Sequence, residues 1–200
     1  MTVTDIIEDA LDLFGEPTDT DGKYNRDGYK LLTRFVNRVY ADVCKKTNCS
    51  RTTTVITTNP DQREYALPPD NIGVRKVMFK GSPLIPIFED KGIDEGGYPL
   101  QYYTIGRKFI GFNPLPKDRF EMTVHHFNRP TAGISGDAVP VMVPDDYHYV
   151  ISYGVVAELF KIDKGDRSNG AVKWNGIYLT EIDTMKAELR KKRDKFPSLG

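Results

Sequence analysis

Two Pro-Asp pairs and a later Glu-Asp-Lys run form the pattern in this sequence that best suits chemistry. The pairs are Pro60-Asp61 and Pro69-Asp70, and the run is Glu89-Asp90-Lys91. Two carboxylates can hold a divalent metal while a lysine assists the attack of water on a phosphodiester, as in metal-dependent nucleases. Both pairs, however, lie in turn-forming clusters, and the run opens a polar loop. The strands around them are not flanked by helices, so a nuclease is the least favoured hypothesis.

Histidine and cysteine offer weaker alternatives. His125 and His126 are adjacent in a strand pattern, so their side chains point to opposite faces and cannot bind one ion without a third element. Cys44 could be a nucleophile, but it has no neighbouring histidine, and an inert thiol at a helix end is the favoured interpretation. The sequence therefore predicts no catalytic residue, no metal site and no cofactor.

The central block from Arg51 to Pro130 consists of short strand patterns separated by turns. Its β-branched and alternating runs are too short for helices. A chain with six or seven such runs at this spacing favours an antiparallel sandwich or barrel. The runs are Thr52–Thr58, Arg63–Leu67, Arg75–Lys80, Gln101–Ile105, Lys108–Phe112 and Phe120–His125.

Two turns within this block can be predicted from local sequence. Gly106-Arg107 separates two strand patterns, and glycine first in a two-residue loop predicts a hairpin with a type II′ turn. Gly81, Ser82 and Pro83 predict a second turn after the strand that ends at Lys80.

The flanking segments have helical periodicity. Apolar residues at helical spacing predict helices over Val3–Phe14, with Gly15 as its C-terminal cap, and over Tyr29–Lys46, with Asp27 as its N-terminal cap. After a proline- and glycine-rich return, Asp145 or Asp146 is expected to cap a third, strongly apolar helix. A fourth is expected over Val172–Lys195, with the stripe Trp174, Ile177, Tyr178, Met185 and Leu189.

The order of these elements predicts an α+β fold. We expect a four-helix frame, two helices from each end of the chain, with a central antiparallel β-sandwich or barrel inserted into it. Because composition changes abruptly near residues 51 and 130, we expect a helical domain of residues 1–50 and 131–200 and a β domain of residues 51–130.

Charge and hydropathy exclude several classes of protein. Lysine and arginine total 28, as do aspartate and glutamate, so the chain lacks the cationic field of a dedicated DNA-binding protein. The acidic N-terminal stretch does not resemble a signal peptide, and no apolar run reaches membrane-spanning length. Cys44 and Cys49 are therefore expected to be reduced thiols of a cytoplasmic protein.

Several short motifs stand out along the chain. They are Tyr65-Ala66-Leu67-Pro68-Pro69-Asp70, Val77 with Gly81-Ser82-Pro83-Leu84, Tyr103-Thr104-Ile105-Gly106, Ile110-Gly111-Phe112-Asn113-Pro114-Leu115-Pro116 and Val143-Pro144-Asp145-Asp146-Tyr147. Together they resemble the motifs of the head-to-tail adaptor proteins of tailed bacteriophages, the class that includes podophage tail tubular proteins. The resemblance extends over nearly the whole chain.

The resemblance implies a structural virion protein without catalysis. It implies a homo-oligomeric ring, usually of twelve copies, which lies below the portal protein and attaches a tail nozzle or tail tube protein. Genomic DNA would pass through the channel without specific binding, and assembly would take place in the host cytoplasm. A monomeric tail or baseplate accessory module is the alternative.

The resemblance also implies that the C-terminal segment reaches toward the portal. In this chain that segment has a basic helix end followed by two large apolar residues, which suits ordering on the surface of a partner. The expected portal-binding residues are Arg190, Lys191, Lys192, Arg193, Lys195, Phe196 and Leu199.

Overall fold

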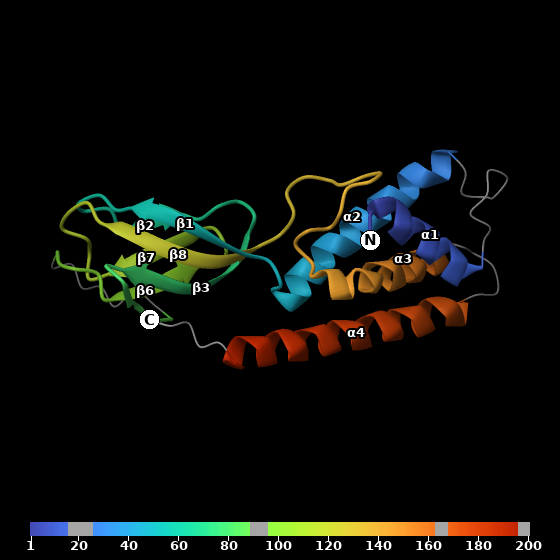
Figure 1. The fold of residues 1–200 in the computed structure, drawn as a ribbon. Coiled ribbons are helices and arrows are strands. Elements are labelled where there is room, and N and C mark those ends of the chain that lie inside the picture. Colours follow the sequence, from blue (N-terminus) through green and yellow to red (C-terminus); the bar gives the residue numbers. More distant parts are fainter. Residues whose placement is uncertain (16–25, 89–95, 163–167, 196–200) are drawn as a thin grey trace. The chain divides into compact units, whose positions relative to one another are not determined.

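The computed structural model describes residues 1–15, 26–88, 96–162 and 168–195 of the 200-residue chain (Figure 1). These residues form two compact units. The helical unit contains the residues up to Cys49 and those from Pro130 through the last helix, and the β unit contains Ser50–Arg129. That the two units also fold independently stays a prediction.

The helical unit is built around its third long helix, α3. Its elements are α1 (Val3–Phe14), α2 (Arg26–Thr47), the 3₁₀ turn η1 (Asp145–Tyr147), α3 (Tyr149–Ile162) and α4 (Ser168–Lys195). Helices α1, α2 and α4 all contact α3, and α4 runs along it (Figure 1). Five apolar side chains of α3 are completely buried, which agrees with its uninterrupted apolar sequence. They are Val150, Ile151, Val155, Val156 and Leu159.

Both ends of α1 are closed by local hydrogen bonds. The Thr2 hydroxyl accepts from the Asp5 N–H at 3.1 Å, and the Asp5 carboxylate accepts from the Thr2 N–H at 2.7 Å, which is a capping box. At the other end Gly15 adopts the left-handed conformation, with φ of 82°, and its N–H donates to Leu11 and Asp12 carbonyls. The Gly15 cap was predicted from sequence and is confirmed.

The N-terminal caps predicted for α2 and α3 are wrong. Helix α2 begins at Arg26, so Asp27 lies inside its first turn. Asp145 and Asp146 lie in η1, and α3 begins only at Tyr149. The reason is His148, whose ring is buried and bonded through Nε2 to the Val143 carbonyl at 3.0 Å, which holds the chain in a tight turn before α3.

The β unit consists of two four-stranded sheets with the orders β1-β8-β3-β4 and β2-β7-β6-β5. All pairs of the described strands are antiparallel except β5 with β6. The predicted α+β class, with a central sheet insertion between N-terminal and C-terminal helices, is thus confirmed. The strands are β1 (Arg51–Thr57), β2 (Glu64–Ala66), β3 (Asn71–Phe79), β4 (Ser82–Pro83), β5 (Ile85–Pro86), β6 (Gln101–Ile105), β7 (Phe109–Asn113) and β8 (Glu121–Asn128).

One apolar core joins the two sheets. The first sheet contributes Ile56, Val77, Met122 and Val124, which alternate with exposed or half-buried residues along their strands. The second contributes Tyr65, Leu67, Tyr102, Ile110 and Phe112. Val77 and Phe79 are two residues apart in β3, so their side chains lie on the same face of the sheet, as predicted. They pair with Val124 and Met122 of β8.

Both predicted turns differ from the structure. Ile105 pairs with Phe109, so the β6–β7 hairpin has a three-residue loop, Gly106 to Lys108, instead of a two-residue type II′ turn. The Lys108 carbonyl accepts from the Leu67 N–H at 2.7 Å, a bond outside the hairpin that the local sequence cannot reveal. Between β3 and β4 the turn consists of Lys80 and Gly81, both with positive φ.

Helix α3 approaches α2 so closely at Gly154 that a side chain would not fit. A Cβ atom there would lie 2.4 Å from Val39 Cγ1 and 3.2 Å from the Tyr178 ring. At Gly176 of α4, by contrast, a Cβ atom would meet nothing within 4 Å. Alanine substitutions at these two glycines therefore distinguish the effect of close packing on stability from the effect of helix propensity.

We expect Gly154→Ala to destabilise the protein by about 1 to 2 kcal/mol, because overpacking outweighs the gain in helix propensity. The matched variant Gly176→Ala should stabilise it by about 0.5 to 1 kcal/mol. Urea unfolding followed by circular dichroism measures both. Equal stabilisation by the two variants would contradict the close packing of α2 and α3.

Candidate interaction surface

Helix α4 is twice as long as α3, with 28 residues against 14. It is anchored in the helical core by Tyr178, Ile182 and Met185, each at most 4% exposed. Of the predicted stripe, Tyr178 and Met185 are buried, whereas Trp174, Ile177 and Leu189 are half-buried. Ile182 was missed, although it fits the same helical spacing.

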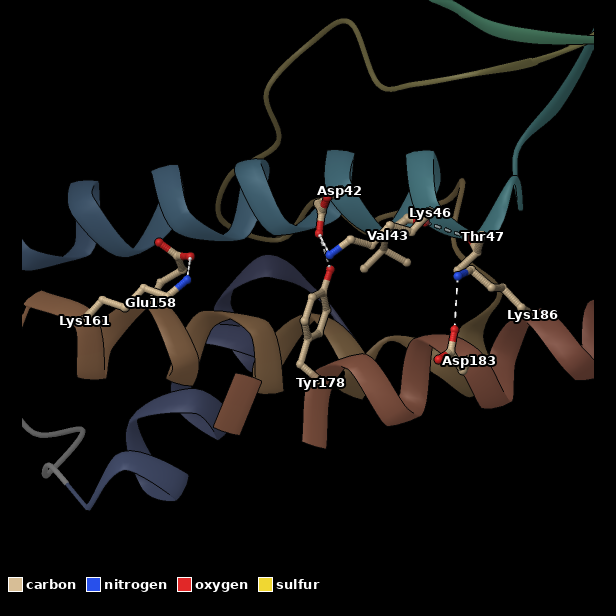
Figure 2. A network of polar contacts seen from close by, with 9 residues as sticks. All are labelled: Asp42, Val43, Lys46, Thr47, Glu158, Lys161, Tyr178, Asp183 and Lys186. Carbon is tan, nitrogen blue, oxygen red and sulfur yellow. Dashed lines mark hydrogen bonds and ion pairs between the residues drawn. The ribbon is translucent and has the colours of Figure 1, made fainter. Parts of the chain in front are cut away.

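A tyrosine and a lysine meet one carboxylate between α4 and α2. The Tyr178 hydroxyl donates to Asp42 Oδ2 at 2.8 Å, and Lys46 Nζ lies 2.7 Å from the same oxygen (Figure 2). Lys46 also lies over the Tyr178 ring, 5.0 Å from its centroid. Burial, and then the bond to Asp42, raise the pKa of Tyr178 well above its ordinary value, so the hydroxyl stays a donor.

Two further tyrosines bind glutamates of α4 near the start of α3. Tyr149 donates to Glu181 at 2.8 Å, and Tyr147 donates to Glu188. Burial and the bond to Glu181 raise the pKa of Tyr149 to about 12. These pairs were not predicted from the sequence. Glu181 and Glu188 are seven residues apart and so share one helix face, but nothing in the sequence points to the tyrosines.

The basic cluster begins directly after these anchors. Arg190, Lys191 and Lys192 are exposed and follow Leu189, the last core-packed residue of α4. Cations at a helix C-terminus interact favourably with its dipole. Arg193 and Lys195 belong to α4, but their side chains are outside the described part of the structure. The predicted anchors Phe196 and Leu199 also lie outside the described residues.

A cavity of about 240 Å³ lies between α2, α3 and α4, and its charged groups are paired with one another. Glu158 of α3 forms ion pairs with Arg38 and, at 2.8 Å, with Lys161. Asp42 holds Lys46 and Tyr178, as described above (Figure 2). The bonds of Glu158 to Arg38 and of Asp42 to Tyr178 therefore connect the three helices.

The predicted nuclease pattern is not assembled among the described residues. Asp61 is exposed in a turn with φ of 61°, and Asp70 accepts from Asn128 Nδ2 at 3.3 Å. Glu89, Asp90 and Lys91 lie outside the described residues. Within residues 1–15, 26–88, 96–162 and 168–195, no three His, Cys, Asp or Glu side chains are grouped so that they could hold a metal ion.

The histidines and cysteines are engaged locally. His125 hydrogen-bonds to the Thr53 hydroxyl of β1 at 3.1 Å, and His126 hydrogen-bonds to the Thr54 hydroxyl at 3.0 Å. The Cys44 and Cys49 sulfur atoms lie 3.8 Å apart, within reach of a weak hydrogen bond between the two thiols. This bond and burial raise the pKa of Cys44, so its thiol stays protonated, which disfavours the nucleophile hypothesis.

The described residues thus form a helical frame interrupted by a β insertion, with a cationic helix end exposed on α4. The chain matches the model of the SU10 adaptor protein family over residues 1–198 and belongs to this family. Its role is that of a bacteriophage head-to-tail adaptor, a structural component of the virion. A comparison with curated proteins found no match. None of the described helices is long and apolar enough to cross a membrane.

We expect Tyr178→Phe to lower the free energy of unfolding by about 1 to 2 kcal/mol, because Asp42 loses a buried donor. Tyr153→Phe is the control, since the Tyr153 hydroxyl bonds to no described residue while its ring packs on Tyr149 and Trp174. Urea unfolding of both variants measures the difference. Equal stabilities of the two variants would show that the bond to Asp42 does not anchor α4.

Proposed function

We propose that this adaptor assembles as a ring, of twelve copies, below the portal protein and that it presents an attachment surface to a tail nozzle or tail tube protein. Membership of the adaptor family over residues 1–198 is the observation that carries the proposal. The genome would pass through the ring. The equal numbers of cationic and anionic side chains suit a channel in which DNA slides without being held.

We place the contact between copies on the outer side of α4. Val172 is 75% exposed and Leu179 is 40% exposed. They are seven residues apart, so both lie on one face of the helix, and large apolar side chains exposed together are typical of a protein interface. A contact of this face with a different surface of the next copy would close into a ring.

In a variant with both Val172→Asp and Leu179→Asp, the ring should dissociate, because a carboxylate buried without a partner is costly. The matched control is Thr180→Asp with Thr184→Asp, which adds the same charge on another exposed face of α4. Sedimentation velocity and negative-stain electron microscopy measure assembly, and circular dichroism confirms that each variant is folded. A monomeric unmodified protein would favour the accessory-module alternative.

We assign portal binding to the basic end of α4 and the residues after it, namely Arg190, Lys191, Lys192, Arg193, Lys195, Phe196 and Leu199. The support is that Arg190, Lys191 and Lys192 are exposed just beyond the last anchored turn, where they are accessible to a partner. Surface charges of this kind set the association rate and its salt dependence.

We expect Lys191→Glu with Lys192→Glu to weaken binding to the purified portal protein about tenfold at low salt, and less at high salt. The control pair, Lys30→Glu with Lys45→Glu, reverses two exposed lysines on α2. Deletion of residues 196–200 should also weaken binding while leaving the melting temperature nearly unchanged. Interferometry measures the affinity for the portal protein. If the Lys191→Glu, Lys192→Glu variant and the deletion variant both bind as tightly as the unmodified protein, the portal contact lies elsewhere.

A further inference from the structure

Strand β1 is the longest edge strand among the described strands. It pairs with β8 alone, over seven residues and without a bulge. The other edge strands are much shorter: β2 has three residues, and β4 and β5 have two each, with a proline in both. Short length and proline are devices that protect sheet edges from pairing with other chains.

The pairing register shows which backbone groups of β1 are unpaired. The Thr58 N–H donates to the Phe120 carbonyl at 2.8 Å, and this pair continues the register of β1 with β8. In an antiparallel ladder hydrogen-bonded pairs alternate along the strand, so Thr52, Thr54 and Ile56 also face β8. The N–H and C=O groups of Thr53, Val55 and Thr57 therefore point away from the sheet.

The side chains of these three residues leave the edge accessible. Thr53, Val55 and Thr57 are all exposed, and the Val55 side chain is 56% exposed. Among the described residues, none hydrogen-bonds to their backbone groups. From Thr52 to Thr57 the strand has no charged residue and no proline, and it is rich in β-branched residues, which favour a strand neighbour.

The N-terminal end of β1 lies beside a cationic hollow. A cavity of about 90 Å³ is lined by Arg51, Thr53, Arg75 and His125, together with Thr52 and His126. Arg75 is the extra residue of a bulge in β3 between Val74 and Lys76. Burial and the positive charges of Lys76 and Arg75 lower the pKa of His125, which indicates a positive local field. A carboxylate is the group that suits this hollow.

We propose that β1 binds an extended segment of another virion protein as an added strand, with an acidic side chain of that segment in the hollow beside Arg75 and His125. The proposal rests on the proposed function, because an adaptor must bind neighbours of a different kind. The backbone groups of Thr53, Val55 and Thr57 would supply the affinity, and the cationic hollow would set the register.

A second copy of this chain is the less suitable occupant. Pairing of β1 with another β1 in antiparallel fashion is two-fold symmetric, whereas a ring requires two different surfaces in each contact. The other described edge strands of a second copy have only two or three residues, so each could bond to only a small part of β1.

Amide hydrogen exchange, read at single residues by mass spectrometry, tests the proposal on the unmodified protein. In the purified ring, the N–H groups of Thr53, Val55 and Thr57 should exchange rapidly, while those of Thr54 and Ile56 are protected. In intact virions the exchange of the first three should slow by at least about tenfold. Thr54 and Ile56 serve as internal controls.

Protection of Thr53, Val55 and Thr57 already in the purified ring would overturn the proposal in favour of pairing between copies. Rapid exchange of these amides in virions that contain the protein would overturn it as well. Both results can be read whatever the copy number of the ring. If the purified protein is a monomer, the proposed ring is wrong, but the comparison of amide exchange between purified protein and virions still tests the β1 proposal.

Variants test the same edge independently. Val55→Pro removes an outward N–H without breaking a bond to β8, so the purified protein should keep its fold and ring. Its incorporation into virions should fall at least about tenfold relative to Val55→Thr, which keeps the N–H and the β-branched shape. Arg75→Gln should reduce incorporation less strongly. Equal incorporation of Val55→Pro and Val55→Thr would overturn the proposal.

Discussion

The burial of α3 is the constraint on which the helical unit depends. Nearly every side of this helix is apolar and covered, so α1, α2 and α4 must all pack against it. Gly154 allows α2 to approach, because any larger residue would overlap Val39. The N-terminal and C-terminal helices are thus joined in one core, although the whole β unit lies between them in the sequence.

Helix α4 is held to this core by hydrogen bonds from tyrosines as well as by apolar packing. The bonds from Tyr147 to Glu188, Tyr149 to Glu181 and Tyr178 to Asp42 all involve α4 residues between positions 178 and 188. A neutral tyrosine can donate to a carboxylate while its ring packs against apolar neighbours, so each pair combines a polar bond with apolar packing. They hold α4 against η1, α2 and α3 up to Glu188, just before the basic cluster that begins at Arg190.

The β unit satisfies a different constraint, because its strand edges must be protected unless they bind a partner. Among the described strands, three edge strands are short, and two of these contain proline, whereas β1 is long and nearly uncharged. An adaptor needs a separate surface for each neighbour. The outer side of α4, its basic end and the β1 edge are three chemically different surfaces, one apolar, one cationic and one formed by backbone groups.

The sequence by itself determined the features that depend on neighbouring residues. Period 3.6 and period 2 patterns predicted four helices and a strand block, and Gly15 predicted a helix end, because side-chain alternation and left-handed φ are local properties. The order of elements and the short motifs were sufficient for the fold class and for the adaptor resemblance.

Only the tertiary structure decided which distant groups meet. The Leu67 N–H donates to the Lys108 carbonyl, 41 positions away in the sequence, at the end of the three-residue hairpin loop. The partners of Tyr147 and Tyr149, and the position of β1 at a sheet edge, likewise depend on residues tens of positions away. Such contacts follow from packing of the whole unit, and a local pattern carries no record of which remote segment will supply the partner.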